Sequence, residues 1–434
     1  MKKVIFRKLH LWLSVPFGLV IVITCLTGAI LVFEDEVTAL CNKDVATVEV
    51  KGDPLPFRTL VESVEKSLPD GVSVSGVVVS EKPTDAYKIN LSKPKGAALY
   101  VNQYTGEVIG EAGRLPFFGT IFRFHRWLLD SNPGNGAIFW GKTIVGTSTL
   151  CFVLILLTGL VIWWPRNRKM LKNRLRVALR KGGKRFWFDL HVAGGFYVLS
   201  ILLVMALTGL TWSFQWYSNG VYSFFDDYTG ASVAISSRKS DASTLCVGDC
   251  ANCTGHPCRI TADTVVAVVE VADAVSGATV QHGTVAVLDD SGNSVNALVD
   301  GESGATMLAE DNVSSEYDAW QDAYENVVKM LPSKGKYTVN KDAVSVPCGG
   351  WGNSRASDKY NFNDETGELE SVDRYENSSS LSKARGWVYT LHTGSWGGWF
   401  SSIIYSLVAL LGATLPLTGY YFWIRRLYMK RKNV

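Results

Sequence analysis

The sequence predicts a membrane protein: a four-transmembrane-helix bundle, built from a duplicated two-helix unit, that carries exported α+β modules. Three observations predict this fold class. Four long runs contain no Asp, Glu, Lys or Arg. Short basic segments lie at the start of the chain, between the second and third runs and after the fourth run, and histidines and glycines repeat at matched spacings. The chain has 434 residues, enough for folded domains beside the helices, and its net charge of +3 is too small to indicate a nucleic-acid partner.

The four apolar runs are long enough to cross a bilayer, because about 20 helical residues span about 30 Å of hydrocarbon. They cover residues 9–33, 144–164, 190–214 and 399–424. Tryptophans fall at the ends of the second and third runs, as in an aromatic belt. No convincing cleavage site follows the first run, so we interpret it as a retained helix rather than a signal peptide.

Basic residues predict the orientation. The start of the chain, the 166–187 link and the 425–434 tail are rich in Lys and Arg, which favours the cytoplasmic side. The expected organisation is therefore a series of eight segments, with membrane helices and basic cytoplasmic segments separating two large exported domains. These segments are helix 1 (1–33), exported domain 1 (34–137), helix 2 (138–165), basic loop (166–187), helix 3 (188–216), exported domain 2 (217–391), helix 4 (392–424) and cytoplasmic tail (425–434).

The two halves of the chain follow one plan. In the first and third runs a histidine precedes the glycine of a Leu-Thr-Gly triplet by 18 residues, from His10 to Gly28 and from His191 to Gly209. The second and fourth runs repeat the pattern with unequal spacing, from His125 to Gly159 and from His392 to Gly419, and the extra residues lie in the turn-rich DSNPGNG. Both halves begin in the cytoplasm, so the repeat is parallel. We assign the Thr-Gly pairs to helix packing, since small residues let helices approach closely in lipid.

Four of the six histidines occupy equivalent places in the two halves. The topology sorts them into His10 with His191 at the cytoplasmic side and His125 with His392 at the exported side. Ionisable groups at membrane depth are costly and usually functional. Two histidines on facing helices are the arrangement that holds a haem iron in a helix bundle. Another metal such as zinc or copper, or a structural role, stays open, although metal sites of that kind usually recruit further ligands.

Residues around the histidines suggest further contacts. Gly18, Gly194 and Gly195 would leave room for a flat macrocycle. Arg123 and Arg126 flank His125, where they would pair with haem propionates or extend to the membrane interface.

The exported segments read as small α+β modules. Residues 54–111 combine an amphipathic helix with alternating strands, and 316–372 repeat that order, with YVNQYTGEVIG echoed by YNFNDETGELESV. Residues 260–308 are a candidate further copy. We find no nucleophile–base pair, phosphate loop or carboxylate dyad in them, and we assign His256 and His282 no role.

Together, the histidine-plus-LTG pattern, the ends LVIWWPR and YYFWIRR and the YVNQYTGEVIG-type modules resemble the PepSY-associated transmembrane family. That group includes bacterial iron-regulated inner-membrane proteins and ferric-siderophore reductases. The resemblance implies PepSY-like exported domains and a multi-pass inner-membrane oxidoreductase with two haem b groups, which reduces a ferric siderophore in the periplasm. It implies His10, His125, His191 and His392 as axial ligands. The sequence shows no flavin or nicotinamide fingerprint, so the expected electron donor is quinol or a separate cytoplasmic reductase.

A cysteine cluster departs from the pattern that we associate with this family. Cys246, Cys250, Cys253 and Cys258 fall within LCVGDCANCTGHPC. An oxidising compartment favours disulfides, while a zinc-type site and a redox-active Cys250–Cys253 pair stay open. Cys25 and Cys151 lie inside apolar runs and are expected to serve packing.

Two alternative functions remain. One is a membrane-anchored sensor or peptidase regulator that binds through the PepSY modules and has no redox activity. The other is a thiol-reducing electron exporter that uses the cysteine cluster.

Overall fold

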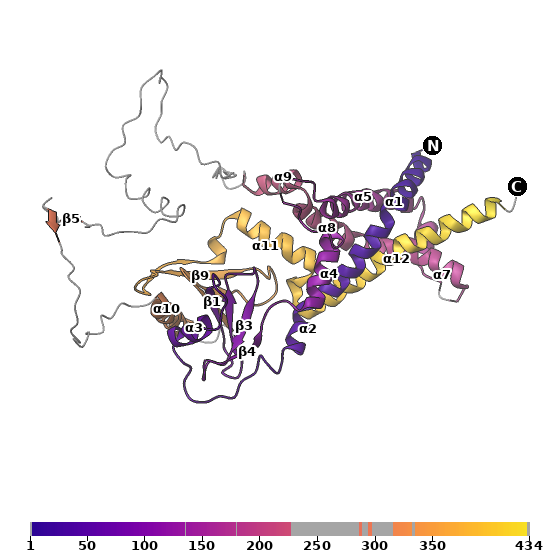
Figure 1. The fold of residues 1–434 in the computed structure, drawn as a ribbon. Coiled ribbons are helices and arrows are strands. Elements are labelled where there is room, and N and C mark those ends of the chain that lie inside the picture. Colours follow the sequence, from indigo (N-terminus) through magenta and orange to yellow (C-terminus); the bar gives the residue numbers. More distant parts are fainter. Residues whose placement is uncertain are drawn as a thin grey trace, which may run out of the picture. The chain divides into compact units, whose positions relative to one another are not determined.

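The computed structural model describes residues 2–134, 136–178, 180–226, 286–288, 294–296, 316–331 and 335–431. The chain divides into two units, residues 1–233 with 313–434 and residues 234–312. The first unit holds a helix bundle and a β-sheet domain (Figure 1).

Four helical segments are long and apolar enough to cross a membrane, as predicted. They are α1 (Lys2–Leu31), α5 (Trp140–Trp163), the run from α7 (Gly183–Asp189) through a π-helical turn (Leu190–Gly194) to α8 (Gly195–Ser213), and α12 (Gly398–Arg431). Helix α1 packs against α5 and α12, and α8 packs against the same two helices (Figure 1).

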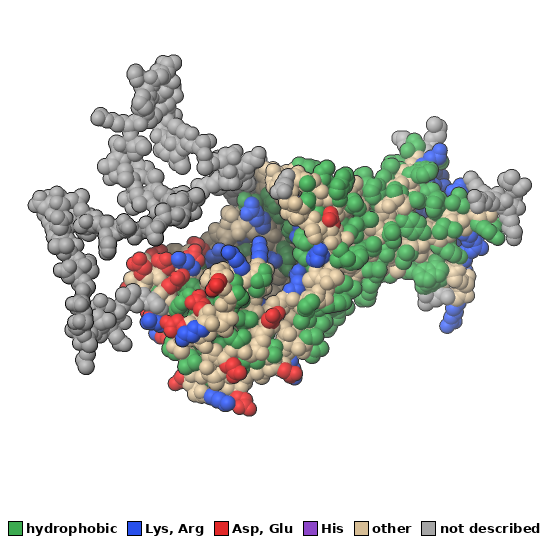
Figure 2. Space-filling model, in the orientation of Figure 1, with side chains coloured by type: hydrophobic (Ala, Val, Ile, Leu, Met, Phe, Trp, Pro, Cys, Tyr) green, Lys and Arg blue, Asp and Glu red, His purple; other side chains and the backbone are tan. Residues whose placement is uncertain are grey.

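The bundle is apolar inside and outside. Its core includes Ile21, Phe152, Leu202, Leu210 and Val408. Many outward-facing side chains of the same helices are also hydrophobic, and Figure 2 shows them as a continuous apolar surface. A helix that is hydrophobic all round is stable when lipid replaces water. The chain is therefore a multi-pass membrane protein.

Shorter helices flank the spans. They are α2 (Glu34–Cys41), α4 (Pro116–Trp127), α6 (Arg168–Arg174), α9 (Gln215–Asp226), α11 (Ser380–Thr393) and the 3₁₀ turns Tyr375–Asn377 and Ser395–Gly397. Helix α4 contacts α1 and α5, while α11 contacts α8 and α9. These contacts bring the side chains of α4 and α11 to the bundle.

The sheet domain contains one eight-stranded antiparallel sheet in the order β10-β9-β8-β7-β1-β2-β3-β4. The strands are β1 (Val74–Ser80), β2 (Tyr87–Leu91), β3 (Ala98–Val101), β4 (Val108–Glu111), β7 (Lys336–Asn340), β8 (Ala343–Pro347), β9 (Ser357–Phe362) and β10 (Leu369–Asp373). Each half of the chain contributes one helix, α3 (Phe57–Glu65) or α10 (Glu316–Met330), followed by four strands.

The two sets of strands join through β1 and β7, where Val77 lies opposite Val339. The sequence suggests two modules, whereas the structure unites their strands in one sheet. Pairing β1 with β7 satisfies two edges whose backbone groups would otherwise stay open. Phe57 and Leu60 of α3 share one buried core with Trp320 of α10, so both halves depend on the same packing.

The second unit is described only in β5 (Ala286–Leu288) and β6 (Ser294–Asn296), which pair antiparallel. The cysteine cluster at 246–258, His256 and His282 lie outside the described residues, as does most of the candidate copy at 260–308.

Candidate functional site

The four predicted histidines form two pairs. The ring centres of His10 and His191 are 6.4 Å apart, and those of His125 and His392 are 6.2 Å apart. These are the partners expected from the topology. His10 comes from α1, His191 from the π-helical turn before α8, His125 from α4 and His392 from α11.

The π-helical turn positions His191. Such single turns insert one residue into a helix and often occur at functional sites. Asp189, just before this turn, is buried and pairs with Arg185 through Oδ2 and Nε at 2.9 Å. Its Oδ2 also accepts the backbone N–H of Ala178, so this carboxylate anchors α7 to the preceding link and does not contact His191.

In each of the four paired histidines, Nδ1 contacts the threonine of one Leu-Thr-Gly triplet. The Nδ1–Oγ1 distances are 3.2 Å for His10–Thr158, 3.1 Å for His125–Thr27, 2.8 Å for His191–Thr418 and 3.1 Å for His392–Thr208. Each contact stays within one half of the chain, whereas each histidine pair joins the two halves.

The same Nδ1 atoms also lie beside the backbone carbonyl three residues before each threonine. Nδ1 of His10, His125 and His392 is 3.0, 3.0 and 2.9 Å from the oxygens of Ile155, Thr24 and Met205. For His191, the residue at the equivalent position is Leu415, whose backbone also interacts with the imidazole. A carbonyl only accepts hydrogen bonds, so Nδ1 carries the proton and the neutral ring keeps its Nε2 lone pair. This tautomer is the form in which histidine binds a metal through Nε2.

The glycine of the triplet gives the imidazole its space. A Cβ at Gly28 or Gly209 would lie 3.0 Å from Cε1 of His125 or His392, and one at Gly159 would lie 3.3 Å from Cε1 of His10. At Gly419 a Cβ would meet nothing within 4 Å. The assignment of the triplet to helix packing was therefore incomplete, because threonine and glycine together seat a histidine from a neighbouring helix.

The glycines expected to leave room for a macrocycle contact protein side chains instead. A Cβ at Gly18 would lie 2.5 Å from the Tyr420 hydroxyl, which donates to the carbonyl of Val15. Gly194 and Gly195 lie against leucine side chains. The sequence prediction was wrong for Gly18, which admits Tyr420 of α12 close to α1. Gly194 faces Leu190 of its own π-helical turn, and Gly195 faces Leu415 of α12 at ordinary contact distance.

Loss of contact with water favours the uncharged form of His125 and His392. Helices α4 and α11 lie outside the four candidate spans. Loss of water lowers the pKa of His125 to about 3, with a smaller effect from neighbouring His392. Loss of water also lowers the pKa of His392 to about 4. Neutral imidazoles are the form that ligates metals.

The spacing of each pair fits one metal ion between two imidazoles. With metal–nitrogen bonds of about 2 Å on both sides, the two ring centres lie about 6 Å apart. Among the described residues, no group of three or more His, Cys, Asp or Glu side chains is placed to hold a metal. Two protein ligands per ion suit a centre whose remaining ligands come from a macrocycle.

A cavity of about 460 Å³ surrounds His125 and His392. Apolar residues of all four spans line it, together with Gly28 and Gly209. Its charged lining residues are Arg114, Arg126, Lys142, Arg355 and Glu34, and Glu34 pairs with Arg114. The guanidinium of Arg126 lies over the rings of Phe122 and Trp127. Apolar walls with cations at the edge suit a flat apolar group that carries carboxylates.

Arg123 differs from its neighbour. Its Nη2 donates to the carbonyl of Leu129 at 3.0 Å and to the Ser131 hydroxyl at 3.4 Å. It stabilises the turn after α4, where Leu128 and Leu129 adopt positive φ angles of 52° and 66°. Of the two arginines singled out in the sequence, only Arg126 lines the cavity.

Trp212 also belongs to the site around His125 and His392, although the sequence indicated only a place in an aromatic belt. Its ring centre is 5.1 Å from that of His392, and its side chain lines the same cavity. Cys25 also lines this cavity, while Cys41 is exposed. The sequence signal for Trp212 was its place three residues after Gly209.

Comparison with known families identifies the family of the chain. The family described as the PepSY-associated TM region matches residues 7–426. No curated protein matches the chain.

Proposed function

Since the chain belongs to the PepSY-associated TM family, we propose that it is a di-haem b oxidoreductase of a bacterial inner membrane that reduces a periplasmic ferric chelate. The two half-buried histidine pairs carry this proposal, because each Nδ1 contacts a threonine hydroxyl and the rings of each pair are spaced for one ion. His10 and His191 would hold one haem, and His125 and His392 the other.

Each haem supplies a one-electron Fe(III)/Fe(II) couple, and the protein positions and tunes it. The four threonines fix the orientation of the imidazoles and accept from Nδ1. Arg126 would pair with a propionate at the edge of the cavity.

The two pairs lie near opposite ends of the bundle. His10 belongs to one pair, and Thr27 on the same helix seats the other, so the rise between them along α1 is about 25 Å. A bilayer core is about 30 Å thick. This separation supports electron transfer from the cytoplasmic or quinone side to the outer side, with the basic termini in the cytoplasm and the sheet domain exported.

Reduction of the chelate consumes one electron for each Fe(III) converted to Fe(II). Quinol or a cytoplasmic reductase would supply this electron. The hard oxygen ligands of a siderophore hold Fe(II) less well than Fe(III). Transfer of one electron would therefore loosen the iron.

The contact pattern also supports a duplicated unit. In the first half, His10 of α1 contacts Thr158 of α5, and His125 of α4 contacts Thr27 of α1. His191 and His392 repeat this arrangement in the second half.

The visible spectrum of the purified protein tests the proposal. We expect a Soret band that sharpens and shifts when dithionite is added, with two haems per chain by pyridine haemochrome assay. A colourless preparation would instead favour the membrane-anchored binding or regulatory protein. Replacing Cys250 and Cys253 by serine distinguishes the reductase from the thiol-reducing electron exporter. Ferric-chelate reduction should survive in this double variant, whereas an exporter that uses the cysteine cluster would lose its activity.

Replacing Thr208 by valine should raise the midpoint potential of the His125–His392 centre and leave its haem in place. The hydroxyl accepts from Nδ1 of His392, and losing this acceptor makes the imidazole a weaker electron donor to iron. One hydrogen bond of about 1 kcal/mol corresponds to about 40 mV for a one-electron couple. Redox titration followed in the visible bands measures the shift.

Thr414→Val is the matched control, because the Thr414 hydroxyl donates to the carbonyl of Leu411 in its own helix and contacts no histidine among the described residues. An equal shift in this variant, or none in Thr208→Val, would contradict a tuning role for the threonine.

A further inference from the structure

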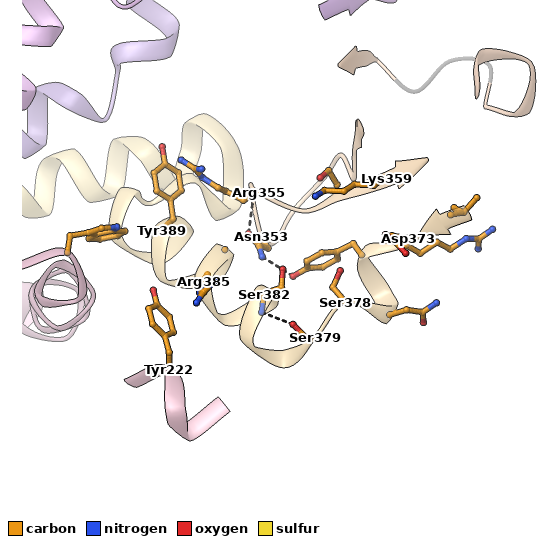
Figure 3. Close-up of a pocket in the computed structure, with 17 residues that line it drawn as sticks. Tyr222, Asn353, Arg355, Lys359, Asp373, Ser378, Ser379, Ser382, Arg385 and Tyr389 are labelled. Carbon is orange, nitrogen blue, oxygen red and sulfur yellow. Dashed lines mark hydrogen bonds between the residues drawn. The ribbon is translucent and has the colours of Figure 1, made fainter. Parts of the chain in front are cut away.

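Figure 3 shows a second cavity of about 800 Å³, which shares lining residues with the first. Its walls come from β9 and β10, the turn that follows β10, the 353–355 loop and α11, with Trp212 and Tyr222 on the side of the bundle. The size is that of a site for a small ligand.

The cavity is strongly basic. Arg355, Lys359, Arg374 and Arg385 line it against one carboxylate, Asp373. Among the described residues no ion pair neutralises any of these four cations. Asp373 accepts from the Asn361 amide at 2.9 Å. A hollow that concentrates one sign of charge attracts ligands of the opposite sign.

The floor of the cavity is fixed by buried hydrogen bonds. Asn353 is buried and its amide donates to the Tyr375 hydroxyl at 2.8 Å. Its carbonyl oxygen accepts from the backbone of Arg355 at 3.0 Å and from Thr390 at 3.1 Å. A Cβ at Gly386 would approach the Asn353 amide to 2.3 Å, so only glycine admits this side chain against α11. The loop that presents Arg355 is therefore held before any ligand arrives.

The basic cavity leads to the His125–His392 pair. Trp212, Arg355 and Tyr389 line both cavities. Arg385, Tyr389 and His392 follow one another along one face of α11, four and three residues apart. The guanidinium of Arg355 lies 3.8 Å from the centre of the Tyr389 ring, and the Trp212 ring lies 5.1 Å from the ring of His392. A ligand in the basic cavity would sit within one layer of aromatic side chains of the histidine pair.

We propose that this basic cavity binds the ferric chelate, and that the chelate it selects carries a net negative charge, as carboxylate- and catecholate-type complexes do. The proposal rests on the proposed function and adds the charge class and the place of the substrate. Guanidinium groups from a loop and a helix bind carboxylate or catecholate oxygens through charge-assisted hydrogen bonds. A cationic hydroxamate chelate would meet four like charges.

Binding of redox-inert gallium chelates tests the proposal without electron transfer. The full-length haem-loaded protein in detergent is titrated calorimetrically with the Ga(III) complex of diethylenetriaminepentaacetate, which is an anion. A parallel titration uses the Ga(III) complex of a linear trihydroxamate amine, which is a cation. We expect saturable binding of the anion at one site and at least about tenfold weaker binding of the cation.

Arg385→Gln and Lys359→Gln should each weaken binding of the anionic chelate by about tenfold. Arg168→Gln is the charge-matched control, since Arg168 is exposed on α6 and does not line the cavity. Haem content of the same samples reports whether each variant is folded. Equal affinity for the two gallium chelates, or equal loss in the control, would overturn the proposal.

Further outcomes distinguish a lipid headgroup from a chelate as the bound anion, and failure of the anion-site proposal from failure of the proposed reductase function. If micelles of phosphatidylglycerol displace the chelate while phosphatidylcholine micelles do not, the cavity holds a lipid headgroup and the proposal fails. If the protein contains no haem but binds the anionic gallium chelate selectively, the proposed anion site stands and the proposed reductase function fails. If the protein contains haem but binds neither gallium chelate, the proposed reductase function stands and the proposed anion site fails.

Discussion

Replacing His392 by alanine is expected to remove about half of the bound haem, and His125→Ala should remove the same half. Each histidine would be one of two axial ligands, and the facing ring, 6.2 Å away in this pair, does not hold the iron alone. His10→Ala and His191→Ala should remove the other half. Haem per chain, by pyridine haemochrome assay on detergent-purified protein, measures each loss.

Double variants sharpen this test. His125→Ala combined with His392→Ala should lose no more haem than either single variant, whereas His10→Ala combined with His125→Ala should lose nearly all of it. His282→Ala is the control, because no role is assigned to that residue. Additive losses within the His125–His392 pair would show that the two residues do not share one haem.

Gly209→Val should also empty the His125–His392 site, although glycine ligates nothing. A Cβ at this position lies 3.0 Å from Cε1 of His392, and the two methyl groups of valine add further bulk. The ring has no way to retreat without breaking the Nδ1 contacts to Met205 and Thr208. We expect a loss of about half the haem, visible as a halved Soret absorbance per chain.

The fourth triplet offers a matched control. Gly419 occupies the same place in its motif, but a Cβ there meets nothing within 4 Å. Gly419→Val should therefore keep both haems. If both valine variants lost haem equally, general disturbance of helix packing would explain the result better than displacement of His392.

The spans and the histidine partners were predictable because local sequence encodes them. An uncharged run of sufficient length has few stable environments other than lipid. The matched spacing from His10 to Gly28 and from His191 to Gly209 placed the histidines at comparable depths, and the basic segments divided them between two ends. The structure brings together the same partners.

The seat of each histidine was not predictable in the same way. Thr-Gly in an apolar helix has a general explanation in close packing. Its actual contact depends on a carbonyl and a hydroxyl meeting an imidazole from another helix, which spacing along one helix does not reveal. Gly18 shows the opposite error, since the space beside it is filled by Tyr420 of a distant segment.

Long-range assembly explains the other differences. The pairing of β1 with β7 joins residues more than 250 positions apart, and nothing in either strand marks its partner. The cations of the basic cavity are likewise dispersed over a loop, a strand and α11. No motif in the sequence connects Arg355, Lys359 and Arg385, and only the fold places them around one cavity.

The exchange of contacts between the two halves has a mechanical consequence. Each imidazole is seated on its own half and faces a ring from the other half, across the α1–α12 and α5–α8 contacts. A slide of one half past the other would leave all four threonine seats intact and change both ring-to-ring gaps at once. An iron bound between two such rings would therefore link the two halves of the chain at each end of the bundle. Loss of the link at one end would leave the other pair to resist the sliding of the two halves by itself.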